Sequence, residues 1–265
     1  FQTLTCPAVK QTALVQRNSE TTLAPSSPLA LNPAHRPDAY SDVFRAHGRL
    51  HIPAILAPDS ATDLYQALSS GQDWTRSIHV AEGQDMDIPI ADLEALSADD
   101  RARYEQSLTG SSTDTLQYIF DTVRISAQMR KEVALSPYWV AIHNFINSAA
   151  FLNFVSRATG QDNLGFADVM ATRYLPGHFL TAHGDENPAE RRLLAYVLNM
   201  TPTWRADWSG ILMFLDEEGH VAEGYVPAFN ALNLFSVPQV HAVSMVTRLA
   251  RTPRLSITGW LHAAA

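Results

Sequence analysis

The sequence contains a single cysteine, Cys6, among 265 residues. One cysteine cannot form a disulfide within the chain, and it cannot build a zinc site from several thiolates. This scarcity excludes a small fold held together by internal disulfides. It is typical of proteins in a reducing compartment, and we expect a cytoplasmic protein.

Positive charge and long apolar runs are also scarce. Lys and Arg number 19 against 27 Asp and Glu, which gives a formal net charge of -8. Broad binding to a phosphate backbone needs a surplus of Lys and Arg, so we expect no direct nucleic-acid partner. No uninterrupted apolar run reaches the roughly 18 residues of a membrane-spanning helix, so we expect no membrane association.

The sequence does contain enough apolar residues for one core. Hydrophobic residues make up 46% of the chain and charged residues 17%, a composition typical of one domain with a sizeable core. Prolines, serines and threonines break any periodicity in residues 1–36, which predicts an extended N-terminal arm. We expect residues 37–265 to form a single domain, with a helical support and lid region over 37–164 and a β-rich half over 165–265.

Helical periodicity is found before Gly165. Residues 70–115 are polar and irregular apart from one predicted helix, a pattern typical of a lid or binding loop. Strand candidates lie at 50–55 and 118–120. The predicted helices cover residues 38–47, a segment that starts at Asp59 or Ser60 and carries Leu64 and Leu68, residues 98–108 and residues 137–159.

From Gly165 onward, short β-type runs alternate with turn signals such as Pro176-Gly177. Eight such runs favour a jelly roll or another closed β fold. The expected fold class is therefore mostly β with flanking helices, an α+β chain with a cupin-like jelly-roll core. The predicted strands are 166–175, 179–183, 193–198, 211–215, 221–226, 231–235, 240–243 and 254–261.

Three side chains in the β-rich half have the chemistry of a metal site. His183 and Asp185 stand two residues apart at the end of a predicted strand, so their side chains point to the same face. His241, in a later strand, can supply a third ligand from across the barrel. Two imidazoles and one carboxylate can occupy one face of Fe(II) and leave three positions for a cosubstrate and dioxygen.

The last predicted strand carries a possible anion clamp. Arg254 and Trp260 fall on one face of this strand with Ser256 and Thr258, while Leu255 and Ile257 fall on the other. An inward-facing Arg is unfavourable in a core unless it is partnered, and a dianionic ligand would be such a partner.

Simpler interpretations of these residues stay open at this point. The strand can be an edge strand whose polar face meets water, His183 and Asp185 can be a surface pair, and His241 a core histidine. His178 and His262 could border the same cavity, but neither has a partner at ligand spacing.

Four segments, in one linear order, resemble the 2-oxoglutarate- and Fe(II)-dependent oxygenases, in particular their prolyl-4-hydroxylase-like branch. Ser209 departs from the pattern, because many relatives have a second glycine there. The segments are Arg173-Tyr174-Leu175-Pro176-Gly177 with His183-Gly184-Asp185, then Tyr196-Val197-Leu198-Asn199, then Asp207-Trp208-Ser209-Gly210-Ile211-Leu212, and finally His241 with Arg254-Leu255-Ser256-Ile257-Thr258-Gly259-Trp260.

The resemblance implies a double-stranded β-helix, a relative of the jelly roll, in which His183, Asp185 and His241 bind Fe(II). It implies that 2-oxoglutarate chelates the iron through its 2-oxo acid end and that Arg254 pairs with the other carboxylate. The remaining residues that it implies are hydroxyl partners of 2-oxoglutarate, namely Tyr174, Tyr196 and Thr258.

The implied reaction is hydroxylation of an unactivated C–H bond with O2 as cosubstrate, succinate and CO2 as co-products and ascorbate as reductant. The expected substrate is a prolyl residue of a protein or peptide. We expect the substrate pocket to be formed by Trp260 together with the pocket-wall candidates Trp74, Tyr118, Phe120 and Arg124.

Three other functions stay open. The chain can hydroxylate a free amino acid or another small molecule, it can be a metal-dependent β-barrel isomerase or dioxygenase without 2-oxoglutarate, or it can be a non-catalytic sensor of iron or 2-oxoglutarate. The β-rich half is compatible with a monomer or a homodimer.

Overall fold

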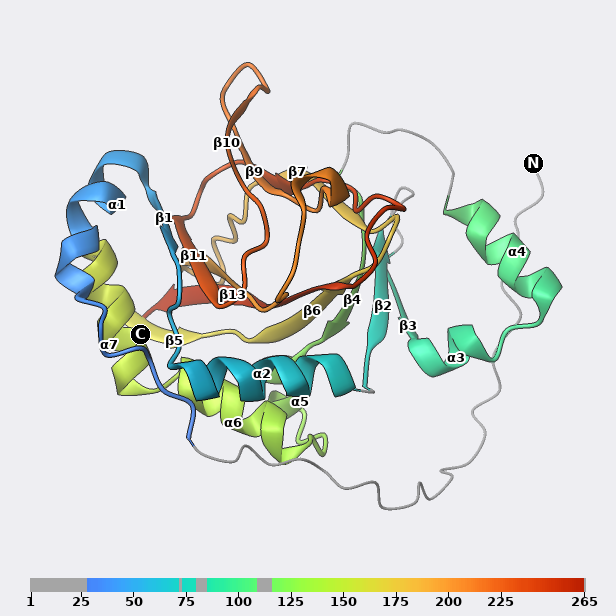
Figure 1. Cartoon of the computed structure of the whole chain (residues 1–265), viewed down its shortest axis with the longest axis horizontal. Coiled ribbons are helices and arrows are strands. Elements are labelled where there is room, and N and C mark those ends of the chain that lie inside the picture. The colour runs from blue at the N-terminus through green and yellow to red at the C-terminus, as the bar shows by residue number, and fades with distance from the viewer. Residues whose placement is uncertain (1–27, 72, 80–84, 109–115, 265) are drawn as a thin grey trace.

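A computed structural model describes residues 28–71, 73–79, 85–108 and 116–264 of the chain. Its main feature is one curled antiparallel sheet with helices on its outer face (Figure 1). The strands are β1 (Arg49–Ile52), β2 (Thr75–His79), β3 (Met86–Pro89), β4 (Tyr118–Val123), β5 (Leu164–Ala167), β6 (Met170–Tyr174), β7 (Phe179–His183), β8 (Arg192–Asn199), β9 (Leu212–Leu215), β10 (Val221–Tyr225), β11 (Ala231–Ser236), β12 (His241–Val243) and β13 (Arg254–Ala263).

The strand order explains how the sheet closes around a site. The order is β1-β11-β8-β13-β6-β4-β7-β12-β9-β10, with β2 and β3 added beyond β4 and with β5 beside β13. Because β4 pairs with both β6 and β7, the sheet turns back on itself and brings β12 and β13 onto opposite walls of one barrel. The predicted jelly-roll core is confirmed.

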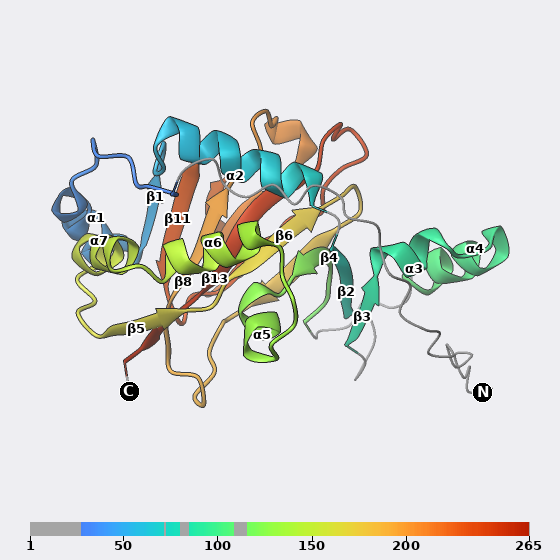
Figure 2. The same ribbon diagram turned by 90° about the horizontal axis from the view of Figure 1, so that it is seen from below.

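The helices lie mainly on one side of this sheet, as Figure 2 shows. Alternation along β8 sends Leu194 and Leu198 into the core under the helices, whereas Ala195 and Val197 belong to a second core inside the barrel. The helices are η1 (Pro37–Tyr40), α1 (Ser41–His47), α2 (Pro58–Ser70), α3 (Ile90–Glu94), α4 (Ala98–Ser107), α5 (Ile125–Arg130), α6 (Pro137–Ile146), α7 (Ala149–Thr159) and η2 (Ala206–Trp208).

The predicted single helix over residues 137–159 is wrong, because two helices, α6 and α7, occupy this range. Ser148 begins α7 as its N-cap, with its hydroxyl accepting a hydrogen bond from the Phe151 N–H at 3.2 Å. The Asn147 amide instead pairs with both backbone groups of Ala167, at 3.0 and 2.8 Å. These polar contacts end one helix and start the next although the apolar pattern continues.

Two other expectations need correction. Residues 70–115 contain β2, β3 and α3 in addition to the predicted helix, and the predicted strand over 166–175 is divided into β5 and β6 at Asp168. The ladder is interrupted here because the Asp168 carbonyl accepts from the Tyr196 hydroxyl at 2.9 Å and the Val169 N–H donates to the Ser126 hydroxyl at 2.9 Å.

Part of the predicted N-terminal arm lies on the core. Leu31 forms an isolated bridge with Leu56, and Leu29 packs against the same cluster. Residues 1–27 of the arm lie outside the described residues.

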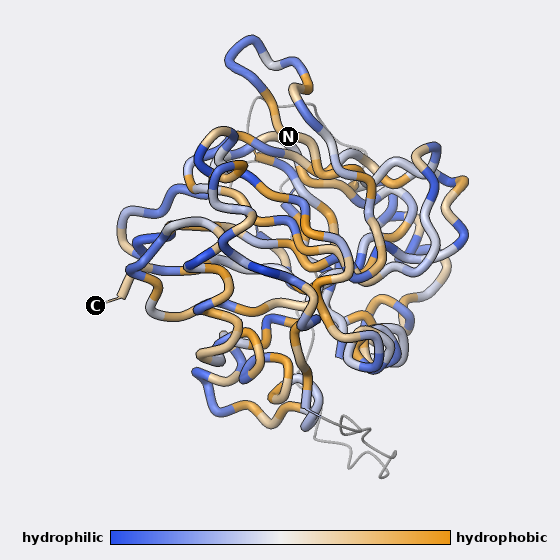
Figure 3. The backbone as a smooth tube through the Cα atoms, turned by 60° about the vertical axis from the view of Figure 1, so that its left-hand side comes forward, coloured by the Kyte–Doolittle hydropathy of each residue, from blue (hydrophilic) through white to orange (hydrophobic). Residues whose placement is uncertain are grey.

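Figure 3 shows apolar residues concentrated in the strands of the barrel, whereas the loop that projects at its top, the β9–β10 hairpin, is mostly hydrophilic. Within the part of the chain that the structure describes, no helix is both long enough and apolar enough to cross a bilayer.

Candidate metal and cosubstrate site

The three candidate metal ligands meet at the end of β7. His183 and His241 are cross-strand partners of β7 and β12, with ring centroids 4.3 Å apart. Asp185 follows β7, and its two carboxylate oxygens lie 3.4 Å from His183 Nε2 and 3.4 Å from His241 Nε2. One ligand atom from each residue lies within 4.8 Å of the others, so a single ion can contact all three.

Backbone carbonyls orient both imidazoles. His183 Nδ1 lies 2.9 Å from the Thr181 carbonyl, and His241 Nδ1 lies 2.8 Å from the Gln239 carbonyl. A carbonyl can only accept, so each Nδ1 carries the proton, and each Nε2 faces Asp185 as the ligand atom.

Burial and neighbouring charges set the ionisation of the site. Burial by itself would raise the pKa of Asp185, but His183, His241 and Trp260 lower it overall, which keeps the carboxylate ionised. Burial lowers the pKa of His241, which favours its neutral form. Burial also acts to lower the pKa of His183, but the hydrogen bond and charge of Asp185 raise it overall. A neutral imidazole and an ionised carboxylate are the forms that bind a divalent metal.

The triad lies in a cavity of about 310 Å³ that also contains Arg254. Arg254 is only 2% exposed and is the cross-strand partner of Tyr174, whose ring centroid lies 5.0 Å from the guanidinium carbon. Among the described residues no carboxylate pairs with this guanidinium, and its Nε has no hydrogen-bond partner. A buried cation without a partner, in the same cavity as the triad, is the feature that an anionic ligand would satisfy.

The predicted hydroxyl partners are placed differently from one another. Tyr174 and Thr258 line the cavity beside Arg254. Tyr196 borders the cavity, but its ring packs against Phe151 under the helices, and its hydroxyl donates to the Asp168 carbonyl at 2.9 Å. The structure therefore contradicts the expectation that the Tyr196 hydroxyl holds the ligand, because residue 196 belongs to the outward-facing set of β8.

Of the residues predicted to form the substrate pocket, all but one line the cavity. Tyr118, Phe120, Arg124 and Trp260 line the cavity. Trp74 does not, because its ring packs edge-on against Trp139 of α6 in the core under the helices.

Arg192 lines the cavity too and was missed by the sequence analysis. Its guanidinium carbon lies 3.7 Å from the Trp260 ring centroid. Its position just before the predicted strand 193–198 gave no signal of this contact.

Neither of the two remaining histidine candidates joins the triad. His178 lines a separate cavity of about 1010 Å³ together with Ile119 and Phe179. Their sequence neighbours Tyr118 and Leu180 line the triad cavity, so this larger cavity lies on the opposite face of β4 and β7. His262 belongs to a polar network outside the barrel, which is described below.

Comparison with known proteins agrees with this geometry. Residues 169–262 match the family model of the 2OG-Fe(II) oxygenase superfamily. The chain is 32% identical over 119 residues to prolyl 3-hydroxylase OGFOD1 of Mus musculus, an alignment that covers 42% of this chain and 21% of that relative. The chain thus matches about a fifth of the length of this curated relative.

Solved structures share the fold. A prolyl-4-hydroxylase of Pseudomonas putida superposes with a TM-score of 0.50 at 17% identity, covering 92% of this chain and 97% of that one. A prolyl hydroxylase of Trichoplax adhaerens, solved with a peptide fragment of the hypoxia inducible factor oxygen degradation domain, superposes with a TM-score of 0.55 at 17% identity, covering 86% and 89%. The part of the chain that carries the site, residues 169–262, is therefore similar in sequence to the 2OG-Fe(II) oxygenase superfamily.

Proposed function

We propose that this protein is an Fe(II)- and 2-oxoglutarate-dependent dioxygenase that hydroxylates a prolyl residue of a protein or peptide. The observation that carries the proposal is the buried, unpartnered Arg254 in the cavity of the His183, Asp185 and His241 triad. The triad by itself fits many metal enzymes, whereas the added cation selects those that hold a second, anionic ligand beside the metal.

The residues present fit both groups. His183, Asp185 and His241 would hold Fe(II) through two Nε2 atoms and a carboxylate, and Arg254 would hold the far carboxylate of 2-oxoglutarate in a bidentate clamp. Iron with 2-oxoglutarate supplies the oxidising chemistry, in which O2 and 2-oxoglutarate are converted to succinate and CO2 as a substrate C–H bond is hydroxylated.

The protein's own part is binding, orientation and exclusion of water. Tyr174 and Thr258 would supply hydroxyl contacts to 2-oxoglutarate; burial raises the pKa of Tyr174 to about 12, which keeps its hydroxyl protonated as a donor. Phe120 stacks on Tyr174 at 5.4 Å, and this apolar wall shields the clamp. No protein acid or base is assigned to the C–H step.

A prolyl substrate is supported by the relatives, which include a prolyl 3-hydroxylase and a prolyl hydroxylase solved with a peptide. Tyr118, Phe120, Arg124 and Trp260 are the side chains that we propose contact it. The hydroxylase of a free amino acid is the second candidate, because a cavity of about 310 Å³ has room for little more than 2-oxoglutarate and one substrate side chain.

The test is succinate formation from 2-oxoglutarate with Fe(II), O2 and ascorbate, with and without a mixture of proline-containing peptides, and with free proline in a separate arm. Peptide-stimulated turnover and a hydroxyl added to proline are expected, and Asp185→Ala should abolish both. Asp99→Ala, an exposed change on α4, is the matched control and should leave turnover unchanged.

Each alternative has its own outcome. Stimulation by free proline alone would assign a small-molecule hydroxylase, and activity that survives loss of Arg254 would assign a dioxygenase or isomerase without 2-oxoglutarate. Binding of iron and 2-oxoglutarate with no succinate from any substrate would assign a sensor.

We further propose ascorbate as the reductant, the cytoplasm as the location and a monomer or homodimer as the assembly. The domain division into an arm (1–36), a helical support and lid region (37–164) and a metal-binding half (165–265) is part of the same proposal.

A further inference from the structure

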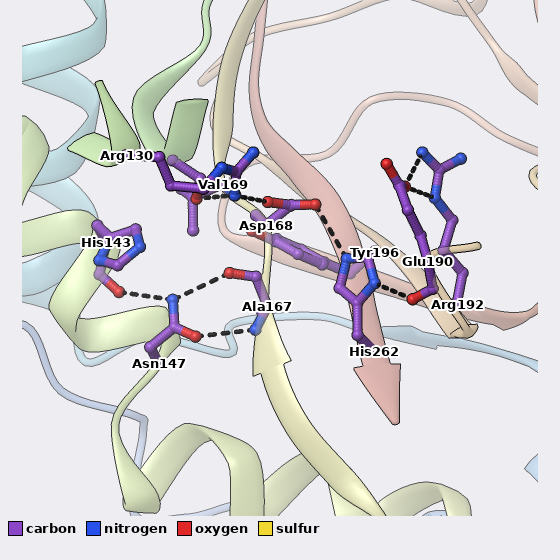
Figure 4. A network of polar contacts seen from close by, with 11 residues as sticks. Arg130, His143, Asn147, Ala167, Asp168, Val169, Glu190, Arg192, Tyr196 and His262 are labelled. Carbon is purple, nitrogen blue, oxygen red and sulfur yellow. Dashed lines mark hydrogen bonds and ion pairs between the residues drawn. The ribbon is translucent and has the colours of Figure 1, made fainter. Parts of the chain in front are cut away.

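A polar network outside the barrel surrounds His262, near the end of β13 (Figure 4). His262 is 2% exposed, and both ring nitrogens have partners: Nε2 lies 2.9 Å from Asp168 Oδ2, and Nδ1 lies 2.7 Å from the Glu190 carbonyl. The carbonyl requires a proton on Nδ1, and the carboxylate favours one on Nε2. Burial acts to lower the pKa of His262, but Asp168 and the Glu190 carbonyl raise it overall.

This cluster is not a second metal site. Asp168, Glu190 and His262 have ligand atoms within 4.8 Å of one another. Both His262 nitrogens are already bonded, however, and the other Asp168 oxygen accepts from Arg130 Nη1 at 2.9 Å. The imidazole therefore has no lone pair to offer a cation, and the cluster is a closed hydrogen-bonded network.

Asp168 is itself held firmly by the core. Its carbonyl accepts from the Tyr196 hydroxyl at 2.9 Å, and its N–H donates to the Trp260 carbonyl at 2.9 Å. A Cβ at Gly259 would lie 1.9 Å from the Asp168 carbonyl oxygen, so only glycine at 259 permits this close approach. The position of Asp168 is thus fixed, and through its hydrogen bond it fixes the orientation of the His262 ring.

His262 in turn contacts the segment 184–191, which carries Asp185. This segment contains no helix or strand. The Asn187 carbonyl accepts from the N–H groups of Glu190 and Arg191, and the Ala263 N–H donates to the Arg191 carbonyl. Side-chain contacts add to these backbone bonds in setting its course. His262 fixes the Glu190 carbonyl at one end of it. At the other end Arg192 Nη1 donates to the Asp185 carbonyl at 3.1 Å, while Arg192 Nε donates to Glu190 Oε2 at 2.8 Å.

We propose that the Asp168–His262 pair is a positioning device for the metal ligand Asp185. It acts through the Glu190 carbonyl and Arg192, and it fixes the ligand segment from outside the cavity. Because Arg192 also covers the Trp260 ring, the same contacts place one wall of the cavity. This inference rests on the proposed function, since it takes Asp185 as a metal ligand.

The experiment measures metal affinity by itself. Co(II) is titrated into the metal-free protein, and its visible absorption, which reports the ligand set, is recorded together with the thermal unfolding midpoint before metal is added. His262→Phe removes both ring donors and keeps a ring against Phe166. We expect Co(II) binding to weaken by about tenfold or more and its spectrum to change, the effect usual for partners of metal ligands.

A matched control separates positioning from general damage. His51 is also a strand histidine that bonds one side chain, Asn233, and stacks on a ring, Tyr225 at 5.1 Å. His51→Phe should leave Co(II) affinity unchanged even where the unfolding midpoint falls. Asp168→Asn, which keeps the shape of residue 168, should weaken Co(II) binding in the same way as His262→Phe. It replaces His262→Phe as the test variant if His262→Phe does not fold.

A double variant tests whether His262 and Arg192 act on Asp185 through the same segment. His262→Phe and Arg192→Met should be less than additive in Co(II) affinity if both act through the same segment. Additive losses, or a lower unfolding midpoint with unchanged Co(II) affinity and spectrum, would overturn the positioning role. The proposed function itself fails if the wild-type protein does not bind Co(II), or if the Asp185→Ala variant binds Co(II) as tightly as the wild-type protein does.

Discussion

At the scale of single residues, Arg254 is the largest of the fully buried side chains in the described structure. Burying an unpaired charge costs several kcal/mol, and contact with the Tyr174 ring offsets only about 1–2 kcal/mol of this. Arg173, on the neighbouring strand β6 opposite Leu255, is paired instead with the fully buried Asp121 at 2.8 Å. The contrast indicates that Arg254 is kept for a ligand rather than for folding.

Arg254→Met should therefore stabilise the metal-free protein and eliminate its response to 2-oxoglutarate. We expect the free energy of unfolding to rise by about 1–3 kcal/mol, with 2-oxoglutarate no longer raising the unfolding midpoint. Urea unfolding with and without 2-oxoglutarate measures both. Arg173→Met is the control of opposite sign, since it takes a partner from Asp121. If Arg254→Met lowered stability as Arg173→Met does, the idea of a missing anionic partner would be wrong.

At the scale of elements, the sequence predicted what alternation and spacing encode. The inward-facing side chains of β13 were predicted correctly, because every second side chain of a strand points to the same face. They are those of Arg254, Ser256, Thr258 and Trp260. The break between α6 and α7 was not predicted, because the apolar period runs through it and Ser148 gives only a weak local signal. The strands β2 and β3 were missed because they are only five and four residues long, and β2 is stabilised by pairing with the distant strand β4.

The turn at Ser209 and Gly210 supports the clamp and has a strained backbone. Ser209 has a φ of 58°, in the region that glycine prefers, and a Cβ at Gly210 would lie 3.4 Å from Arg254 Cδ. The Ser209 hydroxyl bonds the Ser244 hydroxyl at 2.7 Å.

Ser209→Gly should be more stable than Ser209→Ala by about 1 kcal/mol, because both lose the hydroxyl and only alanine keeps the strained Cβ. Urea unfolding of the two variants gives the difference. Ser244 is the matched control, since it is the other half of the same bond and lacks a positive φ. There the order should reverse, with Ser244→Ala the more stable variant. The same order at both positions would show that residue 209 is not strained.

At the scale of the whole molecule, contacts between distant segments decide what the sequence could not predict. The linear motifs located the triad and Arg254, but nothing in the sequence brings Asp168, Glu190 and His262 together. His178 is a second example. It is 4% exposed between β6 and β7, and burial first, then the Arg76 charge, lowers its pKa to about 4, although Asp121 opposes this.

This burial predicts acid sensitivity of the fold. The unfolded chain binds a proton at His178 near pH 6.5, whereas the folded protein does so only near 4, so stability falls as the pH is lowered across this window. The loss from this one group is about 3 kcal/mol, and it is complete below pH 4. Unfolding in urea at several pH values should give a flatter acid limb for His178→Asn than for the wild-type protein. His220→Asn, an exposed change beside β10, should leave the curve unchanged. Parallel curves for wild type and His178→Asn would mean that His178 is protonated as readily in the folded protein as in the unfolded chain.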